Sequence, residues 1–160
     1  MNGDGIGILK INIVYDNDQK VTLWQMTGDK GDKWSEGRVG FDSKNMTYRI
    51  HIVGIRGKNE NGDISIDDLS FEETYCDLYP PEVVGELTTT ATLPTTTTQK
   101  PISDEITCNF DAKNTCGWIN DTTAELTWTL NRGSTSSIDT GLNFLNKSWL
   151  AIGLYLKIVY

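Results

Sequence analysis

Two adjacent carboxylates, Asp67 and Asp68, interrupt a run of apolar, β-favouring residues. Asp is depleted in strands, and an ionised carboxylate in an apolar setting is costly unless it is paired or ligated. Paired carboxylates suit glycoside hydrolysis, where the two groups flank one bond roughly 5–10 Å apart. Because adjacent strand residues point to opposite faces, these two residues do not form such a pair by themselves.

His51 is the only histidine and the other candidate for acid–base chemistry. It alternates with Ile50 and Ile52, and no nucleophile-elbow motif accompanies it. The alternation predicts a strand histidine that faces solvent. Since neither His51 nor the Asp pair has a catalytic partner, we expect the chain not to be an enzyme.

A calcium loop is the metal-binding alternative for this region. Residues 57–68 carry suitable residues at several loop positions, namely Asn59, Asn61, Gly62 and Asp68. However, Gly57 stands at the first position, where the motif requires Asp, and β-type runs flank the loop instead of helices. We therefore do not expect an EF-hand.

A structural interpretation of the Asp pair explains more of the pattern. Ile64 and Ile66 share one parity, whereas Leu69 and Phe71 share the other. The inward face thus switches at residues 67–68, which predicts a β-bulge or a strand that changes sheets.

The elements around these residues are predicted to be strands. Residues 8–15, 21–26 and 48–54 are β-type runs separated by turn-forming clusters, with clear apolar–polar alternation in 8–15 and 48–54. In 8–15, for example, Leu9, Ile11 and Ile13 fall on one face. No stretch of comparable length has a helical period, so the sequence predicts an all-β, antiparallel sandwich or barrel.

Residues 77–107 differ sharply from the rest in composition. Thr fills eight of the eleven positions from Thr88 to Thr98, and prolines lie nearby. Such a segment reads as a mucin-like stalk open to O-glycosylation, or as a simple flexible linker, and the two readings are compatible. The net charge of −8 argues against a nucleic-acid partner.

The cysteines and glycosylation motifs point to the secretory pathway. Cys108 and Cys116 are close in sequence, and we expect a local disulfide instead of two buried thiols. Closing so short a loop is worth roughly 2.5 kcal/mol. Three N-x-S/T motifs support the same compartment; they begin at Asn45, Asn120 and Asn146. We expect no signal peptide within this fragment, because "MNGDGIGILK" has no basic region followed by an apolar core. We expect no transmembrane span either, because "WLAIGLYLKIVY" is short and interrupted by Lys157.

The sequence resembles the MAM domain family, the extracellular module named for meprin, neuropilin and a receptor tyrosine phosphatase. The stretches that carry the first resemblance are "LWQMTGDKGDKW", "YRIHIVGIRG" and "GDISIDDLSF…C", which ends at Cys76. The zone after the linker is similar to the beginning of another copy, through Cys108, Phe110-Asp111, Cys116-Gly117-Trp118, Trp128 and Thr140-Gly141.

This resemblance implies a domain organisation with two incomplete copies. Residues 1–76 correspond to the C-terminal half of a MAM-like domain, 77–107 to the linker and 108–141 to the N-terminal part of a second copy. Residues 142–160 form an unmatched apolar tail, which is a fragmentary gene model, an alternative end or a native strand. The partner that the family provides for Cys76 would lie upstream of Met1.

The resemblance also implies a two-sheet, jelly-roll-like β-sandwich with a non-catalytic role in adhesion and protein–protein contact outside the cell. The expected partners are other extracellular proteins, including homophilic MAM contacts, and the parent protein would be secreted or membrane-anchored. The alternative is an accessory region of a secreted or membrane-bound protease or phosphatase whose catalytic domain lies elsewhere. We expect no cofactor; some members of the family hold a structural cation, for which Asp67, Asp68 and Asp111 are the candidate ligands.

Overall fold

The structure is a computed structural model. It describes residues 1–41, 43, 45–59, 61–71, 77–83, 85, 106–125, 127–132, 148–152 and 156–159.

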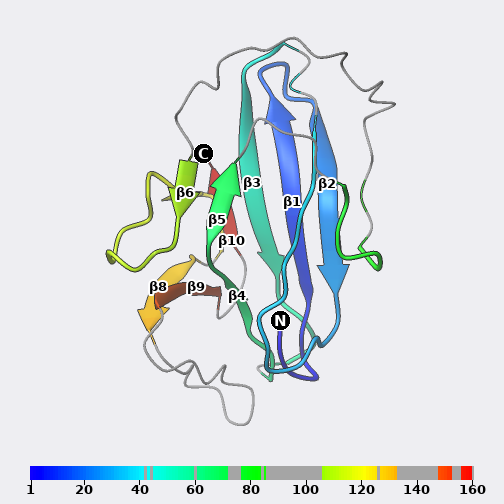
Figure 1. The fold of residues 1–160 in the computed structure, drawn as a ribbon, viewed down its shortest axis with the longest axis vertical. Coiled ribbons are helices and arrows are strands. Elements are labelled where there is room, and N and C mark those ends of the chain that lie inside the picture. Colours follow the sequence, from blue (N-terminus) through cyan, green and yellow to red (C-terminus); the bar gives the residue numbers. More distant parts are fainter. Residues whose placement is uncertain are drawn as a thin grey trace.

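Three long antiparallel strands form the centre of the molecule (Figure 1). They are β1 (Ile8–Tyr15), β2 (Lys20–Thr27) and β3 (Tyr48–Ile55), with β1 in the middle. On the outer side of β3 the same sheet continues through β10 (Leu156–Val159) to β7 (Ile119–Asn120). The predicted runs at 8–15, 21–26 and 48–54 are therefore confirmed as strands.

Two smaller antiparallel sheets complete the described fold. One has the order β4 (Ile64–Ile66), β9 (Ser148–Ile152), β8 (Thr129–Arg132). The other pairs β5 (Leu69–Phe71) with β6 (Ile106–Cys108). No helix occurs in the described ranges, so the predicted all-β, antiparallel class is confirmed, and the arrangement is consistent with a β-sandwich.

The core is built on the apolar face of the central sheet. Ile13, Tyr15 and Leu23 are almost completely buried, and Ile50 and Ile52 lie beside them on β3. Fully burying each such side chain contributes about 1.5–3 kcal/mol. The alternation of β1 thus specifies which face of the sheet turns inward.

A β-bulge in β2 changes which of its residues face the core. Ile11 pairs with Trp24 but Asn12 pairs with Thr22, so Leu23 is the extra residue. Leu23 and Trp24 are consecutive, and both are buried. A bulge permits this because it breaks the strict alternation of a strand.

The Asp67-Asp68 pair marks a change of sheet. β4 ends at Ile66 and pairs with β9, whereas β5 begins at Leu69 and pairs with β6. Asp68 has φ of 50°, a left-handed conformation that Asp tolerates better than most residues. The Asp67 carboxylate accepts a hydrogen bond of 2.8 Å from the Asp68 N–H. The predicted change of sheet at this pair is confirmed.

The prediction that His51 faces solvent is wrong. Its side chain is only 4% exposed. β3 is an internal strand, and His51 pairs with Asn12 on one side and with Val159 on the other. Asn12 is equally buried and accepts a 2.9 Å hydrogen bond from the Thr22 hydroxyl. The alternation along β3 correctly assigns Ile50 and His51 to opposite faces of the sheet. However, the face that carries His51 and Asn12 is also buried at these two residues.

The predicted apolar tail contains two of the strands. β9 and β10 both fall within residues 142–160, and they pair with β4 and β3 respectively.

Candidate functional site

An exposed aromatic and basic surface lies where two distant segments meet. Arg38 and Tyr79 form an isolated antiparallel bridge, with backbone hydrogen bonds of 3.1 Å and 3.0 Å in the two directions. The Trp24 indole N–H donates a 2.8 Å bond to the Tyr79 carbonyl. Because Trp24 is buried in the core, this bond fixes the segment around Tyr79 against the sheet.

The side chains of this bridge remain accessible. The Tyr79 ring is 39% exposed, and the Arg38 guanidinium carbon lies 5.0 Å from its centroid. Arg38 also makes a 3.2 Å ion pair with Glu36, and both of these side chains are about half exposed or more. Exposed ion pairs and cation–π contacts each contribute about 1 kcal/mol or less, so they orient these groups more than they stabilise the fold.

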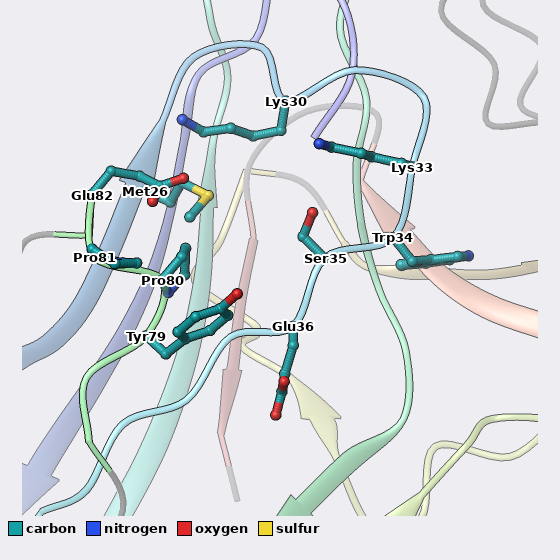
Figure 2. A pocket seen from close by; sticks show the side chains of 10 residues that line it. All are labelled: Met26, Lys30, Lys33, Trp34, Ser35, Glu36, Tyr79, Pro80, Pro81 and Glu82. Carbon is teal, nitrogen blue, oxygen red and sulfur yellow. The ribbon is translucent and has the colours of Figure 1, made fainter.

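A cleft of about 460 Å³ adjoins this bridge (Figure 2). Ser35 and Glu36 line it from one segment, and Tyr79 to Glu82 line it from the other. Lys30 and Lys33 contribute ammonium groups, and Trp34, which is 37% exposed, stands at its edge. We call Trp34, Glu36, Arg38 and Tyr79 the Trp34–Tyr79 surface.

Asp29 anchors the loop that carries Lys30, Lys33 and Trp34. Its carboxylate accepts bonds of 2.8 Å from the Gly31 N–H and 3.1 Å from the Gly3 N–H. These bonds, the one from Gly31 foremost, hold the pKa of Asp29 below its ordinary value of 3.8. The Lys30 N–H adds a 2.9 Å bond to the Met1 carbonyl.

The arrangement suits recognition of another protein. Exposed aromatic rings and Arg are enriched where proteins bind each other, because they offer large contact area with few rotatable bonds. Within the described residues, no three His, Cys, Asp or Glu side chains are grouped so that they could hold a metal ion. The sequence-predicted cation ligands Asp67, Asp68 and Asp111 are therefore not brought into such a group.

The two cysteines that the sequence singled out are joined by a disulfide in the structure. The Cα atoms of Cys108 and Cys116 are 5.8 Å apart. Two Asx turns shape the intervening loop: the Asn109 and Asn114 side chains accept bonds from the Asp111 and Cys116 N–H groups. Cys76 lies outside the described residues.

The glycosylation candidates differ in their surroundings. Asn45 is exposed on a loop. Asn120 is also exposed, but its amide bonds the backbone of Trp128 twice, accepting at 3.1 Å and donating at 3.3 Å. Asn146 lies outside the part of the chain that the structure describes.

The calcium-like loop is held by the N-terminal segment. The Gly5 N–H bonds the Asn61 carbonyl at 2.8 Å, and Asn2 and Asp63 form an antiparallel bridge. The Asn59 side chain accepts a 2.8 Å bond from the Asn61 N–H. These oxygen atoms thus serve a local turn and its contact with residues 2–5.

Sequence reasoning missed the Trp34–Tyr79 surface. Arg38 and Tyr79 are far apart in the chain, and Tyr79 lies in the zone that composition assigned to the linker. The available signal was the aromatic–proline stretch "LYPPEVV", which is too apolar for a mucin-like stalk.

The comparisons with known proteins identify one family model and a set of relatives. Residues 1–77 match the family model described as "MAM domain, meprin/A5/mu". Neuropilin-1 of Xenopus laevis is 34% identical over 71 residues, which cover 43% of this chain and 8% of that protein. Human neuropilin-1 is 32% identical over 72 residues, covering 44% of this chain and 8% of that protein.

A third relative is the MAM domain-containing glycosylphosphatidylinositol anchor protein 2 of Mus musculus. It is 33% identical over 78 residues, which cover 48% of this chain and 8% of that protein. The matched part therefore spans less than a tenth of each relative. No solved structure gave a significant match. Residues 1–77 of this chain therefore match the MAM domain family model and are similar to the corresponding part of these relatives.

Proposed function

We propose that this chain is a non-catalytic extracellular module for protein–protein contact, from a multi-MAM cell-surface or secreted protein. The observation that carries the proposal is the Trp34–Tyr79 surface on a MAM domain. Its exposed Trp34 and Tyr79 rings and the Arg38 guanidinium are the groups most often found at the centres of protein interfaces.

The family match and the chemistry of the chain support an extracellular location. Three N-x-S/T motifs, a Thr-rich linker and a disulfide all fit the secretory pathway. One relative carries the words "glycosylphosphatidylinositol anchor" in its name, which fits a membrane-anchored parent. The described ranges hold no helix that could cross a bilayer.

The expected partners are other extracellular proteins, and homophilic contact between MAM modules is the specific case we favour. The cleft that adjoins the Trp34–Tyr79 surface carries both signs of charge, through Lys30 and Lys33 and through Glu36 and Glu82. A surface with both signs can complement a copy of itself, as an isologous interface requires.

The alternative is an accessory region of a secreted or membrane-bound protease or phosphatase. Nothing in the described residues favours it over adhesion, but the two differ in one respect. An accessory region would bind the catalytic domain of its own parent protein, whereas an adhesion module binds its partner on another molecule.

A bead assay tests the proposal. Beads coated with the glycosylated, secreted chain should aggregate, and cells should attach to a coated surface. Tyr79→Ala and Arg38→Ala should each reduce both readouts several-fold, because they remove a central aromatic or cationic group. Lys20→Ala, at the exposed start of β2, is the matched control. Equal adhesion by all four proteins would contradict the assignment of this surface, and no adhesion by the unmodified chain would contradict the proposed function.

A further inference from the structure

Three strand pairings join the two sides of the linker. We call residues 1–71 the N-terminal part and residues 106–159 the C-terminal part. β3 pairs with β10, β4 with β9 and β5 with β6, and each pair takes one strand from each part. In the described ranges, β4 and β5 have no strand partner within the N-terminal part. The C-terminal part therefore covers three strand edges of the N-terminal part.

Side chains of the two parts also share one core. Phe71 and Trp118 lie with their ring centroids 6.0 Å apart at an interplanar angle of 31°. The Trp128 indole N–H donates a 3.4 Å bond to the Ile52 carbonyl in a buried position. Phe110, Trp118 and Trp128 are at most 4% exposed, and they belong to the same cluster as Ile13 and Ile50.

In the described residues, the two parts are joined through contacts that are not covalent. The disulfide Cys108–Cys116 lies wholly within the C-terminal part. The linker carries the only peptide connection between them. Contacts of this kind do not distinguish a C-terminal part of the same molecule from that of another molecule, which is the basis of domain swapping.

We propose that the edges of β3, β4 and β5 are a docking surface for the C-terminal part of a second copy of this chain. Two chains would exchange their C-terminal parts, each completing the sheets of the other. When the C-terminal part of a chain undocks, it leaves these edges unpaired, and an unpaired strand edge is a template for pairing with another chain. The inference does not depend on the proposed function, since it uses a surface other than the Trp34–Tyr79 surface.

Concentration decides between the closed monomer and the exchanged dimer. Because the linker joins the two parts in one chain, each chain meets its own C-terminal part at an effective concentration on the order of mM. Dilute chains are then mostly closed monomers. Exchange competes where chains are crowded, as on a densely covered surface, or where docking within one chain is weakened.

The first experiment asks whether docking survives without the linker. The full chain, with Cys76→Ser to exclude an intermolecular disulfide, receives a protease site in place of Thr95–Thr98. After native cleavage the two pieces should co-elute as one species on size exclusion. Phe71→Ala in the same background should lose this co-elution. Separation of the two cleaved pieces in the chain that keeps Phe71 would overturn the proposal. Co-elution of the two pieces in Phe71→Ala to the same extent as in the chain that keeps Phe71 would also overturn it.

The second experiment asks whether a second copy can dock. Phe71→Ala damages the docking surface, and Trp118→Ala damages the C-terminal part. The two full chains are mixed, each with its own tag. The Phe71→Ala chain supplies an intact C-terminal part, and the Trp118→Ala chain supplies an intact docking surface. Sequential purification on both tags should recover a heterodimer.

The matched control mixes two differently tagged Phe71→Ala chains, which have no undamaged docking surface. It should yield at least tenfold less heterodimer than the mixture. Equal yields of heterodimer in the mixture and in the control would overturn the exchange. So would the absence of heterodimer in the mixture, if the two pieces of the cleaved chain still co-elute. Tyr79→Ala should leave both results unchanged, which separates this proposal from the proposed function.

Discussion

Phe71 and Trp118 pack against each other from opposite sides of the linker, with ring centroids 6.0 Å apart. Trp118 is 2% exposed, whereas Phe71 is half-buried. Trp118 therefore contributes the larger buried area of the pair.

Replacing Trp118 should destabilise the whole chain. Trp118→Ala opens a cavity between the two parts, and such changes cost about 3–5 kcal/mol. Chemical denaturation followed by far-UV circular dichroism measures the free energy of unfolding. Ile119→Ala is the matched control, because Ile119 is 61% exposed and should cost little. Similar losses for the two variants would contradict the packing described for Trp118.

Asn120 should stabilise the chain through its amide and not through a glycan. Asn120→Ala removes two hydrogen bonds to the Trp128 backbone and should cost about 2 kcal/mol in the free energy of unfolding. Thr122→Ala abolishes the glycosylation motif but keeps the amide, so it is the control. A loss in Thr122→Ala as large as that in Asn120→Ala would attribute the stability to the glycan.

Gly57 and Gly28 should respond differently to alanine. A Cβ on Gly57 would collide with the backbone carbonyl of Gly5, whereas a Cβ on Gly28 has open space around it. Gly28 has φ of +75°, so Gly28→Ala costs only the left-handed backbone penalty of about 1 kcal/mol. Gly57→Ala should cost about 3 kcal/mol, since backbone must shift. Melting temperatures in the reverse order would refute the close approach of residues 5 and 57.

The lowered pKa of the Asp29 carboxylate implies that the stability of the chain depends on pH. Its pKa is lowered in the folded chain, so its contribution is present above the ordinary value of 3.8 and is lost as the pH falls below that value. Asp29→Ala should melt at a lower temperature than the parent at pH 7. The difference should be small, because Asp29 is exposed, and should shrink as the pH falls below 3.8. A difference that persists unchanged at pH 2 would exclude the charge as its cause.

The disulfide should contribute to stability as a local staple. Cys108→Ser with Cys116→Ser should lower the free energy of unfolding by about 2.5 kcal/mol, the value for closing a short loop. Peptide mapping of non-reduced, secreted chain should recover the two cysteines in one linked fragment. Full alkylation of both without reduction would contradict the bond.

The strands of the central sheet and the change of sheet could be read from the sequence. The strands and the change of sheet both depend on the order of apolar and polar residues in a short stretch of the chain, as at Leu9–Ile13 and at Ile64–Phe71. The burial of His51 could not be read in this way, because it depends on β1 and β10 flanking β3. The Trp34–Tyr79 surface was missed for the same reason: the Arg38–Tyr79 bridge joins residues whose spacing carries no periodic signal.

The pairing of β3 with β10 has a consequence for synthesis in the cell. β1, β2 and β3 follow one another in the chain and can pair as soon as they leave the ribosome, whereas β10 is translated much later. The nascent chain therefore presents the open edge of β3 during the whole interval in which the linker is made. A chaperone that binds this edge would protect the nascent chain from aggregation, and slower translation of the linker would lengthen the time for which the edge is exposed.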